Sequence, residues 1–255
     1  MPTELYIAEK PSQAEDVARV LGNARMAPER THWVTDGGWV TWGFGHLLRQ
    51  LTPDEMEPTK WGSPWSFSQL PMLPERPRFK PDPKRADRLA DIGRLLKQCS
   101  SVTIATDGGS EGEMIGREIL EHFRWNGPVR RLWLNALTPA AIRKALDNIL
   151  PGEKTVRYYH AALARAQADW LIGMNGTRAF TTKSPRGAGT VSIGRVQTAT
   201  VALVVRRDRE IADFVPQSYF ELSVEVRTDK GATVKLRHAP AEEKRILDRA
   251  KAEEI

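Results

Sequence analysis

The chain has 255 residues, of which 40% are hydrophobic, and carries a formal net charge of +6. This length allows one large domain or two smaller ones, and no apolar run approaches the roughly 20 residues that a membrane-spanning helix needs, so we expect no membrane partner. The segment MPTELYIAEKPSQ lacks the apolar core of a secretory signal, and the lone Cys99 excludes an internal disulfide, so we expect a reducing, cytoplasmic compartment.

Strand and helix patterns alternate through residues 1–150. Residues 4–9 predict a short buried strand, and the next segment predicts a helix with Ser12 as its N-cap, Glu15 three residues later and Gly22 at its end. Residues 31–48 predict two strands around an Asp-Gly-Gly turn. Residues 52–83 hold eight of the 17 prolines and therefore predict an irregular, extended surface loop.

Functional groups are expected where the later strands end. Residues 84–98 predict a helix, 101–107 a core strand, 111–123 a helix with acids in its first turn, 129–135 a strand, and 138–150 a helix capped by Thr138. This alternation indicates an α/β sheet, in which functional groups gather at the carboxyl ends of the strands. Glu9 and Asp107 each end a strand, so we expect them to lie side by side.

The pattern of predicted elements changes after Gly152. Residues 155–182 predict an Ala-rich helix, 183–190 a basic loop, 191–214 a second helix, and the chain from about 217 predicts strands followed by a charged helix at 240–254. Residues 157–209 hold nine Arg or Lys and only two acids, so the positive excess is confined to this stretch. Such a stretch suits a polyanion, and the alternative is a solvated helix surface.

The acids at 107–113 suit two kinds of chemistry. They could hold Mg²⁺, which takes oxygen ligands, or transfer protons to an oxygen that leaves a phosphodiester. The alternative is structural, because Glu111 and Glu113 would stabilise a helix N-terminus and Thr-Asp-Gly-Gly is good turn chemistry. Neither a Walker loop nor a Rossmann fingerprint is present, so we expect no bound nucleotide.

Four segments together resemble the type IA DNA topoisomerases, with topoisomerase III as the most similar branch. They are YIAEKPSQA, ATD at 105–107 with SEGE at 110–113, ALARAQADWLIGMNGTRAF and SIGRVQTATVALVVRRDREI. The resemblance implies a toprim (Rossmann-like) α/β domain at 1–152 and a mainly α-helical DNA-binding domain at 153–215. Residues 216–255 would then be the incomplete start of a β-containing gate domain.

The resemblance also implies roles for single residues. Glu9 matches the catalytic acid at the 3′ oxygen, Lys10 could steady the scissile phosphate, and Mg²⁺ would be held by Glu9 and Asp107, with Glu111 as a further candidate. The expected partner is single-stranded DNA, bound by a monomer. The matching DNA-contacting positions are Trp65, Trp170, Arg178, Lys183, Ser192, Ile193, Gly194, Arg195, Val196 and Gln197.

The residues themselves support part of this DNA interface. Free N–H groups at a helix start donate hydrogen bonds to phosphate, and Arg195 adds charge there. Trp170 could stack on a base, or it could be a core tryptophan on the buried face of its helix. Trp65 lies in the proline-rich segment, where packing explains an exposed tryptophan less easily.

The sequence departs from the family pattern Asp-x-Asp-x-Glu-Gly-Glu/Gln. Gly109 stands in place of the second aspartate and Ser110 in place of the usual arginine, so we expect a weakened Mg²⁺ site unless Glu111 or Glu113 substitutes.

The four tyrosines, Tyr6, Tyr158, Tyr159 and Tyr219, also lack the family's nucleophile motif. We therefore expect the N-terminal part of a type IA topoisomerase that is inactive alone. The alternative is a non-enzymatic toprim module that binds single-stranded DNA. A toprim nuclease or primase-like enzyme would leave SIGRVQT unexplained.

Overall fold

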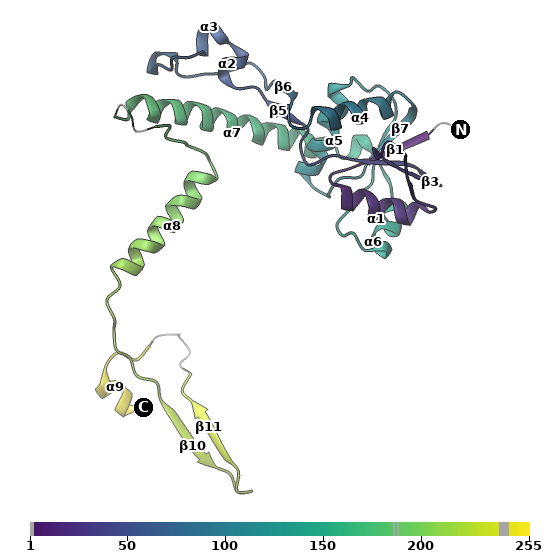
Figure 1. Cartoon of the computed structure of the whole chain (residues 1–255). Coiled ribbons are helices and arrows are strands. Elements are labelled where there is room, and N and C mark those ends of the chain that lie inside the picture. The colour runs from purple at the N-terminus through teal and green to yellow at the C-terminus, as the bar shows by residue number, and fades with distance from the viewer. Residues whose placement is uncertain (1–2, 186, 188, 240–244) are drawn as a thin grey trace. The chain divides into compact units, whose positions relative to one another are not determined.

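The computed structural model describes residues 3–185, 187, 189–239 and 245–255. The chain forms two compact units, Met1–Thr198 and Ala199–Ile255. Figure 1 labels their helices and strands.

A mixed sheet is the centre of the first unit. Within the described residues it has seven strands in the order β2-β3-β4-β1-β7-β8-β9. Their bounds are Arg25–Met26 (β2), Trp33–Thr35 (β3), Gly38–Trp42 (β4), Thr3–Ala8 (β1), Cys99–Ile104 (β7), Val129–Arg131 (β8) and Leu150–Pro151 (β9). The inner strands β4, β1, β7 and β8 run parallel, so their carboxyl ends meet at one edge of the sheet.

Helices cover both faces of this sheet (Figure 1). α4 (Ala86–Leu96) and α5 (Ser110–His122) pack on the face that carries Leu5 and Ile7. α1 (Pro11–Leu21) and α6 (Pro139–Leu146) pack on the opposite face, which carries Tyr6 and Ala8. Successive residues of β1 therefore alternate between two apolar cores, as strand geometry requires. The predicted α/β class is confirmed.

The start of α1 differs from the prediction. The helix begins at Pro11 with Lys10 as its N-cap, so Ser12 lies inside the first turn and makes no capping bond. Proline is favoured at the first helical position because its missing N–H has no partner there anyway. The predicted cap of α6 is correct, since the Thr138 side chain accepts a hydrogen bond from the Ala141 N–H.

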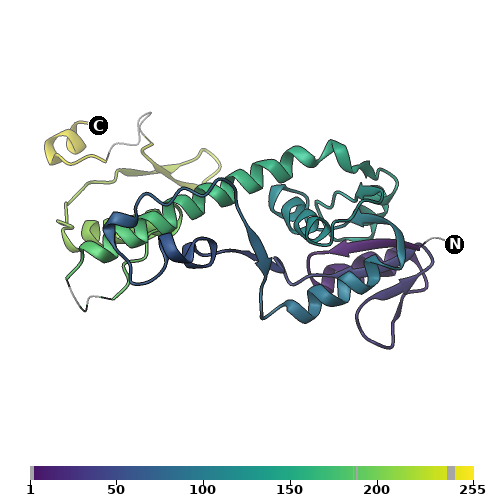
Figure 2. The same ribbon diagram turned by 90° about the horizontal axis from the view of Figure 1, so that it is seen from above.

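The proline-rich segment is more ordered than predicted. It contains α2 (Pro53–Met56), α3 (Pro58–Trp61) and a 3-10 turn at Phe67–Gln69, and it is bounded by β5 (Leu48–Gln50), which pairs with β6 (Phe79–Pro81). Both views show it running along the long helix α7, Val156–Lys183 (Figures 1 and 2). Apolar burial accounts for the difference: Leu51, Met56, Trp61, Met72 and Trp170 form a separate core.

The second unit has little interior. The helix α8 spans Gln197–Ala212, although the sequence predicted a start at 191, and it has no buried residue among those described. β10 (Ser223–Arg227) and β11 (Thr233–Arg237) form an antiparallel hairpin, and α9 covers Arg249–Glu254. The first part of the predicted helix at 240–254 lies outside the described residues. No described helix is both long and apolar enough to cross a membrane.

Candidate functional site

Glu9 and Asp107 lie together at the carboxyl edge of the sheet. Glu9 follows β1 and Asp107 comes shortly after β7; the two strands pair in parallel, and the Ala105 N–H donates to the Ile7 carbonyl at 2.8 Å. Gln13 joins the two residues directly. Its Oε1 accepts from the Glu9 N–H at 2.8 Å, and its Nε2 donates to Asp107 Oδ1 at 2.8 Å. The structure thus brings together the two acids that the sequence placed at strand ends.

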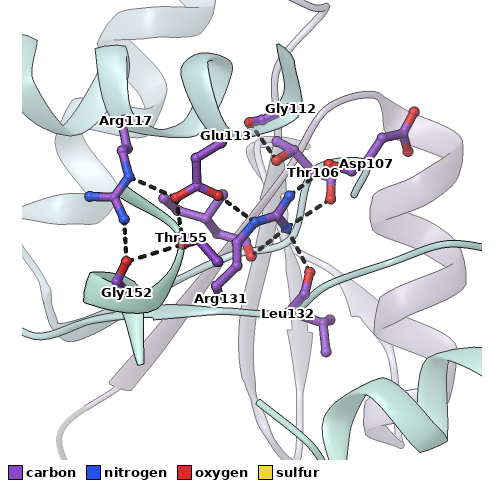
Figure 3. A network of polar contacts seen from close by, with 10 residues as sticks. Thr106, Asp107, Gly112, Glu113, Arg117, Arg131, Leu132, Gly152 and Thr155 are labelled. Carbon is purple, nitrogen blue, oxygen red and sulfur yellow. Dashed lines mark hydrogen bonds and ion pairs between the residues drawn. The ribbon is translucent and has the colours of Figure 1, made fainter. Parts of the chain in front are cut away.

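A buried arginine holds the main chain around Asp107 (Figure 3). Arg131 is completely buried on β8, and its guanidinium donates to the carbonyls of Thr106 at 2.9 Å and Asp107 at 2.6 Å. Burial lowers the pKa of Arg131, while the neighbouring Glu113 charge opposes that shift. Gly112 allows the helix α5 to approach closely, because a β-carbon there would lie 2.2 Å from the Asp107 carbonyl oxygen.

Glu113 is a structural residue in this arrangement. It is completely buried and accepts hydrogen bonds from Arg131 Nε, Arg117 Nε and Thr155 Oγ1, each at 2.7 Å. Its carboxylate is therefore already satisfied by three donors, and Thr155 directly precedes α7. The expectation that Glu113 could replace the missing aspartate is wrong for this structure, because its oxygens are buried in an ion-pair network.

Glu111 pairs with a histidine. His46 Nε2 lies 2.7 Å from Glu111 Oε1, and His46 Nδ1 lies 2.9 Å from an oxygen of the buried Glu118. Burial alone would lower the pKa of His46, but the hydrogen bonds and charges of Glu118 and Glu111 outweigh it and raise the pKa to about 9. Glu111 remains 68% exposed, so one side of its carboxylate faces solvent.

The edge offers two carboxylates for a cation. No group of three or more His, Cys, Asp or Glu side chains in the described part of the chain could hold a metal ion. Mg²⁺ often takes only one or two carboxylates beside substrate phosphates, and Glu9 and Asp107 are the two acids that Gln13 joins at this edge. A β-carbon at Gly109 would meet no atom within 4 Å, but the backbone there has a φ of +157°, which L side chains rarely adopt.

Two predicted DNA-contacting residues are buried. Trp170 is 5% exposed, and its indole N–H donates to the Leu51 carbonyl at 2.8 Å. Arg178 is 2% exposed and donates to the Trp61 carbonyl at 2.6 Å and to Asp54 at 3.0 Å. Both side chains fasten the proline-rich segment to α7. In this structure Trp170 is the core tryptophan of the alternative interpretation, because no free ring face remains for a base.

Other predicted residues are accessible beside that segment. Trp65 is 38% exposed, with the Arg178 guanidinium 4.9 Å from its ring centre. Lys183 is exposed, and its ammonium lies 4.6 Å from the ring centre of Phe67. Phe67, which was not among the predicted residues, is 51% exposed and lies two residues after Trp65.

The stretch Ser192–Gln197 lies against α7. The Ile193 N–H donates to Thr177 Oγ1 at 2.9 Å, and Gln197 Nε2 donates to Ser192 Oγ at 2.8 Å. Arg195 forms an ion pair with Asp169 at 2.7 Å, and both side chains are nearly half exposed. The Gly194 N–H, predicted to be open to phosphate, donates to the Thr198 hydroxyl at 3.0 Å, so a phosphate would have to displace that bond.

Comparisons with known proteins agree with this architecture. A toprim domain model matches residues 4–137, and a DNA topoisomerase model matches residues 153–255. DNA topoisomerase 3 of Shouchella clausii is 37% identical over 257 residues, covering 100% of this chain and 34% of the relative. DNA topoisomerase 3 of Staphylococcus aureus strain USA300 is 37% identical over 226 residues, covering 88% of this chain and 31% of the relative.

The fold also matches a solved structure. Full-length topoisomerase I from Thermotoga maritima superposes with a TM-score of 0.58 at 23% identity, covering 98% of this chain and 37% of that one. The chain spans about a third of the length of the curated relatives named above. By its family models and its relatives, the chain belongs to the type IA DNA topoisomerases, in the topoisomerase III branch.

Proposed function

We propose that this chain provides the toprim and DNA-positioning part of a type IA topoisomerase reaction, in which one DNA strand is cut, another is passed and the first is resealed without ATP. The observation that carries the proposal is the pairing of Glu9 and Asp107 through Gln13 at the ends of two parallel strands. A phosphodiester at this edge would meet an acid for proton transfer and oxygen ligands for a cation.

Each residue at the edge has a distinct task in this proposal. Glu9 exchanges a proton with the 3′ oxygen, and Lys10, which is exposed at the start of α1, neutralises charge on the scissile phosphate. Mg²⁺ held by Glu9 and Asp107 would neutralise further phosphate charge. None of the four tyrosines lies in the family's nucleophile motif, so we expect no relaxation of plasmid DNA by this chain alone.

The missing aspartate provides a direct test of the metal site. We expect Gly109→Asp to raise Mg²⁺ affinity in a calorimetric titration, because it restores a carboxylate two residues after Asp107 and its β-carbon would meet no atom within 4 Å. The φ of +157° strains any side chain at this position, and Gly109→Asn carries the same strain. Gly109→Asn is the matched control, since it adds the same volume without the charge, and Asp107→Asn should remove binding. Equal affinities for the wild type, Gly109→Asp and Asp107→Asn would refute a metal site at this edge.

The partner can be tested separately from the metal. Fluorescence anisotropy with a labelled single strand should show binding that weakens as salt rises, with a log–log slope of roughly −0.7 per phosphate contacted. Lys183→Ala should weaken binding, whereas Lys97→Ala, an exposed lysine at the end of α4, should not. A strand affinity that does not change with salt would contradict the proposed interface.

A second function is supported by Gly109. A chain that lacks one metal aspartate could serve only as a non-enzymatic module that binds single-stranded DNA. This alternative predicts that the chain binds single-stranded DNA and has no detectable affinity for Mg²⁺. It also predicts that Asp107→Asn leaves the affinity for DNA unchanged. The topoisomerase proposal instead predicts that Mg²⁺ binds at Asp107 and that a DNA phosphate strengthens its binding.

A further inference from the structure

Gln13 is a buried polar residue whose side chain bonds to two separate parts of the chain. Its side chain is completely buried on the first turn of α1, where an amide without partners would cost about 1–3 kcal/mol. Both ends of the amide are satisfied, one by the Glu9 main chain four residues away and the other by Asp107, 94 residues away. A single side chain therefore links the two strand ends that carry the acids.

The chemistry of the partners determines the orientation of this amide. A main-chain N–H can only donate, so the oxygen end of Gln13 must face Glu9 and its amino end must face Asp107. Gln13 thus presents a donor to Asp107 and engages its Oδ1 atom. Oδ1 already accepts this hydrogen bond, so the other carboxylate oxygen, Oδ2, has more acceptor capacity left for a cation.

Glu9 is held from both sides. Its N–H donates to Gln13, and its carbonyl accepts from the Gly45 N–H at 3.1 Å. The main chain of Glu9 therefore has little freedom to move relative to Asp107. Because Gly109 stands where the family has an aspartate, Glu9 and Asp107 are the two remaining carboxylates. The distance between them therefore has a strong effect on how tightly a cation is bound.

We propose that Gln13 is a positioning residue of the acidic edge, which sets the spacing of Glu9 and Asp107 and selects the Asp107 oxygen that faces the cation. It touches neither cation nor DNA and acts only through the two acids. The inference rests on the proposed function for its chemistry, whereas the hydrogen bonds that support it do not depend on that function.

A purely local role is the competing explanation. A glutamine at the third helical position often bonds back to the main chain before the helix, which stabilises the helix start without reference to a distant site. In that case the contact with Asp107 would have no consequence for the metal. The two explanations differ in whether the effect of Gln13 depends on Asp107.

Mn²⁺ titration followed by electron paramagnetic resonance tests this dependence. We expect Gln13→Met, which keeps the length but removes both hydrogen bonds, to weaken Mn²⁺ binding on the order of tenfold, as loss of a residue behind a metal ligand commonly does. It should cause no further loss in an Asp107→Asn background. Ser12→Ala, an exposed neighbour on the same turn, is the control and should leave affinity unchanged.

Two results of that titration would overturn the proposal. One is a Gln13→Met chain that binds Mn²⁺ as tightly as the wild type. The other is an equal loss of affinity with and without the Asp107 carboxylate. A wild-type chain that binds no Mn²⁺ would refute the proposed metal site, and the contact would then be judged by a metal-free measurement.

Nuclear magnetic resonance of the metal-free chain provides that measurement and does not require the Gln13 variant to fold. The Gln13 side-chain NH₂ signals should exchange slowly with water, because the group is buried and bonded at both ends. They should shift in Asp107→Asn and remain in place in Ser12→Ala. Signals that exchange at the rate of an exposed glutamine, or that ignore Asp107→Asn, would overturn the proposal.

Discussion

Glu113→Ala should destabilise the sheet domain severely. The Glu113 carboxylate is completely buried and accepts three hydrogen bonds of 2.7 Å, one of them from the equally buried Arg131. Alanine would leave the Arg131 charge without its acidic partner in the interior. Removing one partner of a buried ion pair costs roughly 3–5 kcal/mol, because the remaining charge stays desolvated.

This loss is large against the total stability of a domain, which is typically about 5–15 kcal/mol. For a domain of this size each kcal/mol corresponds to roughly 2–4 °C in melting temperature, so we expect a drop of roughly 6–20 °C. Glu113→Gln should lie between the wild type and Glu113→Ala. It keeps an oxygen acceptor and nearly the same volume while losing the charge.

Thermal unfolding followed by far-ultraviolet circular dichroism would measure the effect. Glu153→Ala is the matched control, because it removes an exposed carboxylate two residues before Thr155 and should change the melting temperature little. A Glu113→Ala chain that melts within about 2 °C of the wild type would refute the reasoning. It would mean that the ion-pair network of Figure 3 contributes nothing to the fold.

The surroundings of His46, Cys99 and Arg178 allow three further predictions. Because the folded pKa of His46 is raised from 6.5 to about 9, its stabilisation is complete below pH 6.5 and is lost as the pH rises to about 9. The melting temperature should therefore fall across this interval more in the wild type than in His46→Asn, and parallel curves would contradict this. Burial raises the pKa of the Cys99 thiol to about 11, so alkylation at pH 8 should be on the order of a hundredfold slower than for an unshifted thiol. Alkylation at the unshifted rate would show that partial burial does not raise the pKa of this thiol. Arg178→Ala should speed limited proteolysis within residues 52–83, because Arg178 fastens that segment to α7, and an unchanged cleavage rate would contradict this role.

Local patterns in the sequence were enough to predict the α/β sheet and the acidic edge. Alternating strands and helices indicate parallel strands, and parallel strands that end in acids bring those acids to one edge whatever the details of packing. For that reason Glu9 and Asp107 could be expected side by side. The proline count of residues 52–83 was a poorer indicator, because proline also begins helices, as Pro53 and Pro58 do here.

Residues whose partners are far along the chain could not be assigned in this way. Gln13 reaches Asp107 across 94 residues, and His46 reaches Glu111 across 65. The sequence left Glu113 as a candidate metal ligand near a helix N-terminus. Nothing in the local sequence indicates that a buried arginine on the distant strand β8 pairs with it. Periodicity predicts which face of an element is apolar, but it does not indicate which polar groups meet inside.

The helix α7 shows most clearly which properties follow from the sequence and which depend on the packed structure. The composition of 157–209 shows a positive charge excess, and this holds for any fold of the chain. Whether Trp170 and Arg178 face solvent depends instead on the packing of a segment more than 100 residues earlier in the chain. A side chain can contact a ligand only where its atoms remain accessible, and accessibility is a property of the packed molecule.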